Sequence, residues 1–352
     1  MTVLAWRETG VPPAGAELFA SLDVVGRREK AGHHTPEAVV RAGRQGREMI
    51  SRPGMLLSVA GAAVALVLVL TVVLVLGDEK SPKPGPPALG AGLDSLVTDF
   101  TSGLSVDQQY RPPSSDERRM TATGFAAILD RRGTAEFEKL GFSMRDGVDP
   151  ATGRPYTIAV NEPGTERAWG MYVIDRSAPP TLVVEVPHPA FDLQTELFGV
   201  DLFRRVPGAV LLVAGAHRKA DDSKADVAHE ENSVFHIVAT ALAGRGLTQV
   251  QLHGFHDQNL PSTDIVLSSG ATVAGDAARR AAARLVAGGF AVCRGWDERC
   301  KGLEGTTNVQ GKLAASDDTV FLHVEMSRTV RESPERRADV VRALAEADLR
   351  KP

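Results

Sequence analysis

The chain has 352 residues, of which 43% are hydrophobic and 24% charged, and its formal net charge at pH 7 is −4. This length suffices for a membrane anchor and one sizeable domain, and the slight negative charge gives no reason to propose nucleic-acid binding. The two cysteines, Cys293 and Cys300, lack the spacing of a Cys-x-x-Cys metal or redox motif. We predict a short-loop disulfide between them, provided that this part of the chain lies outside the membrane.

The first part of the chain predicts a membrane anchor. Residues 1–52 are polar and rich in proline and glycine, so we expect a largely disordered cytoplasmic tail. Residues 55–76 carry no charge, and at about 1.5 Å per residue they span about 33 Å, enough for a hydrocarbon core. We therefore predict a single transmembrane helix within residues 53–76. Four arginines between residues 41 and 52 place the N-terminus in the cytoplasm and the C-terminal domain outside.

A proline- and glycine-rich linker over residues 77–92 should act as a semi-extended spacer. Residues 93–150 form a loosely patterned lead-in, with helical segments expected within 123–140. An α/β domain is predicted over residues 151–352. Its predicted strands are 156–160, 170–174, 181–186, 209–213, 249–252, 290–293 and 319–324, and its predicted helices are 193–205, 233–243, 276–287 and 335–347.

Strands that alternate with helices of this length predict a mainly parallel sheet that is covered on both faces. The first two strands are expected to form an antiparallel hairpin at one edge. The expected fold is therefore a three-layer α/β/α sandwich with a mixed, mainly parallel sheet, preceded by a single transmembrane helix.

Polar side chains lie at the carboxyl ends of four predicted strands, namely His188, His217, His253 and Glu325. Ligands bind outside the carboxyl ends of the strands in an open α/β sheet, so we expect these side chains to converge on one crevice. A single histidine at a strand end is more often a hydrogen-bonded structural residue. Several of them at neighbouring strand ends, accompanied by acids, predict a shared metal site.

We predict that His188, Glu196 and His253 bind zinc and leave the fourth position open for water, which is the pattern of catalytic zinc. Asp192 competes with Glu196, because the two share a face of a helix that starts just after His188. One of these carboxylates would bind the metal while the other would orient a histidine.

His217 and His256 are further candidates, either for binding the metal or for orienting one of its ligands. Glu325 is the predicted general base and acid, which takes a proton from the attacking water and delivers it to the leaving amine. The alternative for Glu325 is a surface position or a salt bridge to Arg328 or Arg331.

Arg218 is a candidate for holding a substrate carboxylate in bidentate fashion, with a structural ion pair as the equal alternative. Asp226, His229 and Glu230 are expected to open a helix. An acid in that position can cap the helix and complement its dipole, and we predict this structural role for the group.

At these residues the chain resembles the zinc-dependent amidohydrolases and carboxypeptidases with the phosphorylase/hydrolase-like fold. That group includes N-acetylmuramoyl-L-alanine amidases, N-formylglutamate amidohydrolases and poly-γ-glutamate hydrolases. The resemblance covers roughly residues 156–347 and rests on Val-Glu-Val-Pro-His188-Pro, Glu196, Leu-His253-Gly and His-Val-Glu325-Met-Ser-Arg. In that group a His and a Glu after the first long strand bind zinc together with a second His, and a Glu near the last strand is the acid/base. The resemblance therefore implies a zinc cofactor and the same ligand set.

Two departures leave the scissile bond open. Seven residues separate His188 from Glu196, which is wider than the carboxypeptidase His-x-x-Glu and narrower than the usual muramoyl-amidase gap. The Gly-His-Gly-Gly context of the amidases is also absent.

The prediction is a membrane-anchored zinc hydrolase outside the cell that cleaves an amide or peptide-like bond. Its expected substrate is a cell-wall peptide, a γ-glutamyl polymer or a short peptide. The alternative is a non-catalytic envelope protein on a degenerate hydrolase fold, which the intact metal set and Glu325 disfavour. A serine hydrolase using Ser268 or Ser269 is disfavoured because no Gly-x-Ser-x-Gly elbow occurs there.

Overall fold

The computed structural model describes residues 92–161 and 164–349, all within one compact unit, Ser81–Pro352. The predicted cytoplasmic tail and transmembrane helix lie outside the described residues, as does the predicted linker up to residue 91. Across the two described ranges, no helix combines the length and the apolar character that crossing a bilayer requires.

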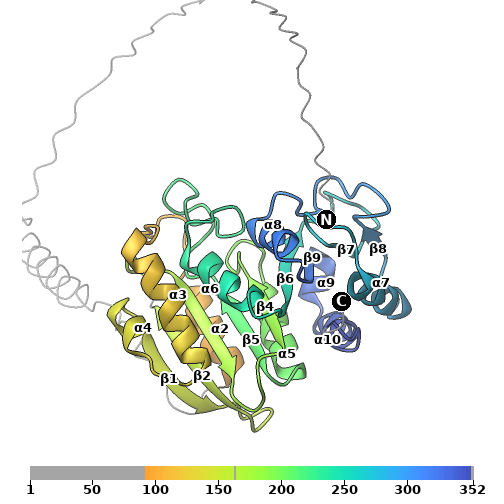
Figure 1. Cartoon of the computed structure of the whole chain (residues 1–352). Coiled ribbons are helices and arrows are strands. Elements are labelled where there is room, and N and C mark those ends of the chain that lie inside the picture. Colours follow the sequence, from red (N-terminus) through yellow and green to blue (C-terminus); the bar gives the residue numbers. More distant parts are fainter. Residues whose placement is uncertain (1–91, 162–163, 350–352) are drawn as a thin grey trace, which may run out of the picture. The chain divides into compact units, whose positions relative to one another are not determined.

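Nine strands within the described ranges form one sheet in the order β1-β2-β3-β5-β4-β6-β9-β7-β8 (Figure 1). The central strands β5, β4, β6 and β9 are mutually parallel, whereas β1, β2 and β3 pair antiparallel, as do β3 with β5 and β7 with β9. The mixed sheet with a parallel centre confirms the predicted α/β class. The strands are β1 Ser143–Val148, β2 Pro155–Asn161, β3 Gly170–Asp175, β4 Leu182–Val186, β5 Ala209–Val213, β6 Thr248–Phe255, β7 Ile265–Ser268, β8 Val292–Arg294 and β9 Phe321–Ser327.

Helices cover both faces of this sheet, because successive side chains of a strand point to opposite sides. Val184 and Leu211 enter a core that includes α5, whereas Val183 and Leu212 enter a second core that includes α6. The helices are α2 Leu93–Ser102, α3 Ser115–Leu129, α4 Ala135–Lys139, α5 Thr195–Arg205, α6 Val234–Ala243, α7 Asp276–Ala287, α8 Val309–Ser316, α9 Arg328–Glu332 and α10 Pro334–Ala345.

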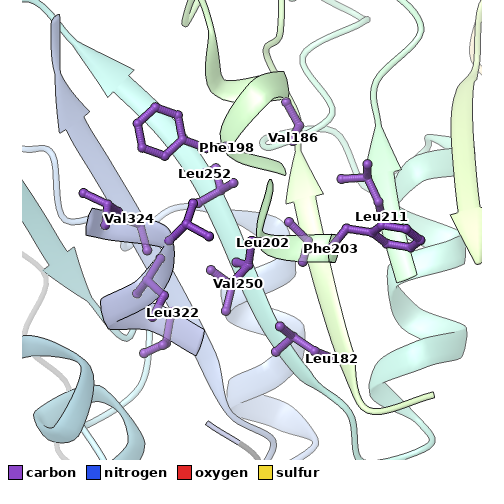
Figure 2. Close-up of a cluster of buried hydrophobic side chains, with 14 of the residues drawn as sticks. Leu182, Val186, Phe198, Leu202, Phe203, Leu211, Val250, Leu252, Leu322 and Val324 are labelled. Atoms are coloured by element: carbon purple, nitrogen blue, oxygen red, sulfur yellow. The ribbon is translucent and has the colours of Figure 1, made fainter. Parts of the chain in front are cut away.

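Figure 2 shows part of the first core, between α5 and the parallel strands. Burial of such aliphatic and aromatic side chains contributes roughly 1.5–3 kcal/mol each, and it holds the central strands in place. The labelled side chains are Leu182, Val186, Phe198, Leu202, Phe203, Leu211, Val250, Leu252, Leu322 and Val324.

Residues 93–150, predicted as a separate lead-in, pack onto the same domain. β1 pairs with β2 in an antiparallel hairpin, α2 packs against α5, and α3 packs against α6. The domain therefore begins before the predicted boundary at residue 151, which lies in the loop between β1 and β2. β1 is an edge strand whose side chains are exposed or half-buried, so its sequence lacks the apolar alternation that predicts a strand.

Cys293 of β8 and Cys300 form a disulfide, which confirms the predicted pairing. Both half-cystines are buried in a small third core with Phe255 and Val266. The disulfide therefore closes a short loop at the β8 edge of the sheet.

Candidate metal centre

A buried face of β6 and β9 carries polar side chains. Val250 and Leu252 of β6 enter the core of Figure 2, whereas Gln251 and His253 point to the opposite face. In the pairing of β6 with β9, Gln251 lies opposite His323 and His253 lies opposite Glu325. All four are buried. Buried polar groups are costly unless they find partners, so this row indicates a functional site.

His188 joins this face from the end of β4. The chain turns there at once, and the backbone N–H of Asp192 donates to the carbonyl oxygen of His188 at 2.8 Å. The turn places Oδ2 of Asp192 3.3 Å from Nδ1 of His188 and 3.1 Å from Nδ1 of His253. All three side chains are buried, and their three ligand atoms could hold one metal ion.

Each of these two histidines holds its other ring nitrogen against an oxygen acceptor. Nε2 of His188 lies 2.8 Å from Oδ1 of Asp226, and Nε2 of His253 lies 2.7 Å from Oε1 of Gln251. Each Nε2 can donate to the oxygen that it faces, and in that neutral tautomer both Nδ1 lone pairs point toward Asp192. The lone pairs of the two Nδ1 atoms and of Oδ2 of Asp192 then point into the same small space. A cation bound there would be attracted by all three groups.

The orientation of Gln251 follows from a helix cap. Oδ1 of Asn308 accepts two backbone N–H groups in the first turn of α8, each at 3.0 Å, so its Nδ2 donates to Oε1 of Gln251. Nε2 of Gln251 in turn donates to Glu185 at 2.8 Å and to Gln310 at 3.1 Å. The amide oxygen of Gln251 therefore faces His253.

Asp226, in the loop between β5 and α6, binds three partners at once. Its Oδ1 faces Nε2 of His188 at 2.8 Å and Nδ1 of His229 at 3.2 Å, and its Oδ2 accepts from Nε of Arg218 at 3.1 Å and from Nη2 at 2.5 Å. Arg218 thus makes the structural ion pair that was the alternative to a substrate contact. The predicted helix-capping role of Asp226 is wrong, because α6 is capped by Ser233.

Glu196 lies outside the group formed by His188, Asp192 and His253. The predicted shared helix face with Asp192 required a helix that starts just after His188. Gln194 instead has a left-handed backbone with φ 71°, and α5 begins only at Thr195. Asp192 therefore lies in the turn before the helix, beside the histidines, while Glu196 lies in the first helical turn.

His217 and His256 also lie outside this group. Nδ1 of His217 accepts from the backbone N–H of Lys219 at 3.2 Å, and its ring meets Phe191 edge-on with centroids 5.8 Å apart. His256 is exposed, and its Nδ1 accepts from the backbone N–H of Gln258 at 3.2 Å. Both imidazoles therefore have local structural partners.

Glu325 lies beside the cluster and forms a second group with His253 and His323, whose ligand atoms lie within 4.8 Å of one another and could also hold a metal ion. Its Oε2 has no hydrogen-bond partner among the described residues, and burial raises its pKa well above the usual value. Neither of the ion pairs considered for it forms, since Arg328 pairs with Glu332 and Arg331 bonds to backbone carbonyls. A buried carboxyl group with a raised pKa beside a metal-ligand cluster suits general acid–base chemistry.

A pocket of ≈ 460 Å³ opens onto Asp192, His253 and Glu325. Phe191 and Leu193 lie at its mouth with 45% and 58% of their surface exposed. Apolar contact area therefore borders the polar cluster, as is usual in sites for small organic ligands.

Three supporting residues were not predicted as parts of the site, namely Asp226, Gln251 and Asn308. The sequence carries a signal for Gln251, because a strand residue two positions before His253 lies on the same face. Asp226 and Asn308 belong to irregular loops, whose spatial position no periodicity predicts.

Comparison with protein-family models found no match, and comparison with curated proteins found none either. Similar solved structures include YndL in its zinc-free form, with 16% identity over 50% of this chain and 88% of that chain and a TM-score of 0.36. A metallo-carboxypeptidase from Burkholderia cenocepacia shows 13% identity over 68% and 69%, with a TM-score of 0.33. An aspartoacylase family protein from Mesorhizobium loti shows 15% identity over 58% and 67%, with a TM-score of 0.31. Similarities this low assign no activity to this chain.

Proposed function

We propose that this protein is a zinc-dependent hydrolase of an amide or peptide-like bond. The observation that carries the proposal is the convergence of Nδ1 of His188, Nδ1 of His253 and Oδ2 of Asp192. Ligands about 2.0–2.1 Å from a tetrahedral zinc ion lie about 3.3 Å apart, and the separations of 3.3 and 3.1 Å from Asp192 fit this geometry. Asp192 thus takes the place that was predicted for Glu196.

The donor set also favours zinc over other common ions. Two imidazole nitrogens and one carboxylate suit zinc, whereas magnesium and calcium prefer oxygen ligands throughout. Three protein ligands with an open fourth position are the pattern of catalytic zinc sites. The acceptors Asp226 and Gln251 keep His188 and His253 in the tautomer that such a site needs.

The proposed chemistry divides between the ion and Glu325. Zinc bound there would polarise a substrate carbonyl and lower the pKa of water. Glu325 would accept a proton from the attacking water and deliver it to the leaving amine. Burial raises the pKa of Glu325 in the metal-free protein, so this carboxyl group binds a proton readily.

We further propose that residues 53–76 anchor the protein in the membrane, with the domain outside the cell and a cell-wall or γ-glutamyl peptide as substrate. The uncharged run of residues 55–76 and the arginines before it support the anchor. The disulfide between Cys293 and Cys300 suits an oxidising compartment. The protein should stay in the membrane pellet through an alkaline carbonate wash, and release into the supernatant would count against the anchor.

The metal centre is tested by measuring the zinc content of the purified full-length protein by mass spectrometry. We expect about one zinc ion per chain in the wild type, its loss in His188→Ala, and its retention in the matched control His256→Ala, because only His188 lies in the ligand group. Glu325→Gln should keep zinc and lose hydrolysis by roughly 10²- to 10⁴-fold.

Two results would contradict this proposal. A folded wild-type protein that neither contains zinc nor takes up added zinc would refute the metal centre. A Glu325→Gln variant that hydrolyses its amide substrate at the wild-type rate would refute the proposed acid–base role.

A further inference from the structure

Arg331, in α9, lies beneath the pocket with only 7% of its surface exposed. Its guanidinium donates to three backbone carbonyl oxygens from separate segments of the chain. Nε donates to Met326 at 3.1 Å, Nη1 to Leu193 at 2.5 Å and Nη2 to Phe255 at 3.1 Å. One side chain therefore connects the turn after β4 with the ends of β6 and β9.

These three segments are the ones that carry the site. The bonded carbonyls belong to the residue after Asp192, to the residue after Glu325 and to the second residue after His253. The planar fork of an arginine has a fixed geometry, so bonds in three directions restrict the relative positions of all three segments.

The residue after His253 makes room for this guanidinium. A Cβ atom added at Gly254 would lie 2.3 Å from Nε and 2.5 Å from Cζ of Arg331, closer than such atoms can approach. The guanidinium packs directly against the backbone of β6 only because position 254 has no side chain. The position of Arg331 therefore explains why glycine follows His253 in the sequence.

Arg331 differs from the neighbouring arginines in lacking an acidic partner. Arg328 pairs with Glu332 at 2.6 Å and Arg337 pairs with Asp201 at 2.9 Å. Within the described part of the chain, no carboxylate lies within ion-pair distance of Arg331, and its three hydrogen bonds go to main-chain oxygens. A buried charge without an ion pair is costly, so its retention here indicates a role that the three carbonyl bonds perform.

We propose that Arg331 is a positioning residue of the metal centre, which fixes the backbone segments of Asp192, His253 and Glu325 relative to one another. It acts through the main-chain carbonyl groups that its guanidinium binds. The inference rests on the proposed function only in that the site binds zinc.

The test compares variants of the full-length protein by zinc affinity, measured by competition with a chelator. Arg331→Met should weaken zinc binding by roughly 10- to 100-fold, the usual range for residues that support metal ligands. Arg331→Lys should lose nearly as much, because a single ammonium group cannot reach three carbonyls. Arg204→Met is the matched control: Arg204 is also partly buried and bonds Asp94 and Asp149, away from the cluster. It should lower stability and leave zinc affinity within about twofold of the wild type.

Gly254→Ala provides a second, independent way to displace the guanidinium of Arg331. It should weaken zinc binding about as much as Arg331→Met, because the new Cβ occupies the position of the guanidinium. The double variant Gly254→Ala/Arg331→Met should bind zinc no more weakly than Arg331→Met alone, since both changes remove one interaction. Additive losses, or rescue by lysine at position 331, would overturn the proposal.

Hydrogen exchange of the zinc-free protein tests the role of Arg331 without depending on zinc binding, so it can fail or succeed independently of the proposed function. Arg331→Met should speed exchange at residues 192–194, 254–256 and 326–328, whereas Arg204→Met should not. Unchanged exchange in these segments would overturn the role of Arg331. A wild-type protein that binds no zinc would refute the metal centre, and the exchange measurement would still decide whether Arg331 holds the segments together.

Discussion

Replacing Asp226 by asparagine removes one charge beneath His188 while it preserves the volume of the side chain. In the wild type, Oδ1 of Asp226 faces Nε2 of His188 at 2.8 Å, and Oδ2 accepts two N–H groups of Arg218. An amide has a single oxygen, so it can accept from one of these neighbours only. Either His188 or Arg218 then meets the NH₂ group, and two donors face each other.

The size of the effect follows from the bond that is lost. A hydrogen bond to a charged group contributes about 1.5–3 kcal/mol. Since about 1.4 kcal/mol changes an equilibrium constant tenfold, we expect the zinc dissociation constant of Asp226→Asn to rise roughly 10- to 100-fold. The reason is that His188 loses the partner that orients its ring and increases the basicity of Nδ1.

Chelator competition at neutral pH measures this constant. Asp201→Asn is the matched control, because the same substitution there breaks another Asp–Arg pair, with Arg337, away from the ligand group. Its zinc affinity should remain within about twofold of the wild type. Equal affinities for wild type, Asp226→Asn and Asp201→Asn would refute the idea that Asp226 supports a metal ligand.

Replacing both Cys293 and Cys300 by serine should lower the free energy of unfolding by about 2–3 kcal/mol, because the disulfide closes a loop with a sequence separation of 7; a urea titration that shows no loss would contradict this. Arg111 holds the pKa of Glu117 at about 2, below its ordinary 4.5, so this carboxylate stabilises the fold above pH 4.5 and the stabilisation is lost as the pH falls toward 2. Glu117→Gln should therefore lower the unfolding free energy by about 1 kcal/mol at pH 7, and the difference should shrink in urea titrations at lower pH. A difference that is constant with pH would argue against the ion pair as its cause.

The convergence at the site was predictable because it depends on short-range patterns. The apolar run before His188 and the alternation of Val250 and Leu252 with glutamines before His253 identify strands, and parallel strands bring their carboxyl ends to one edge. The placement of Glu325 opposite His253 follows from the direct pairing of β6 with β9. Such patterns fix the identity and direction of an element, and they also assign its faces.

The choice of carboxylate was not predictable, because it depends on the backbone angle of one residue. A helix starting directly after His188 would have put Asp192 and Glu196 on one face, but Gln194 has a left-handed backbone and α5 begins only at Thr195. The role of Asp226 depends on the path of a loop between β5 and α6. Long-range packing determines both features, and local periodicity carries no information about them.

Asn308 combines two functions in one amide group. Its oxygen caps α8, and its nitrogen sets the orientation of Gln251 behind His253. Serine, threonine and aspartate also cap helices well, yet none of them has an N–H₂ group to donate. Serine, threonine or aspartate, which a helix N-terminus ordinarily tolerates, would therefore not replace Asn308 without loss. Asparagine should persist at this position while the rest of the loop changes during evolution.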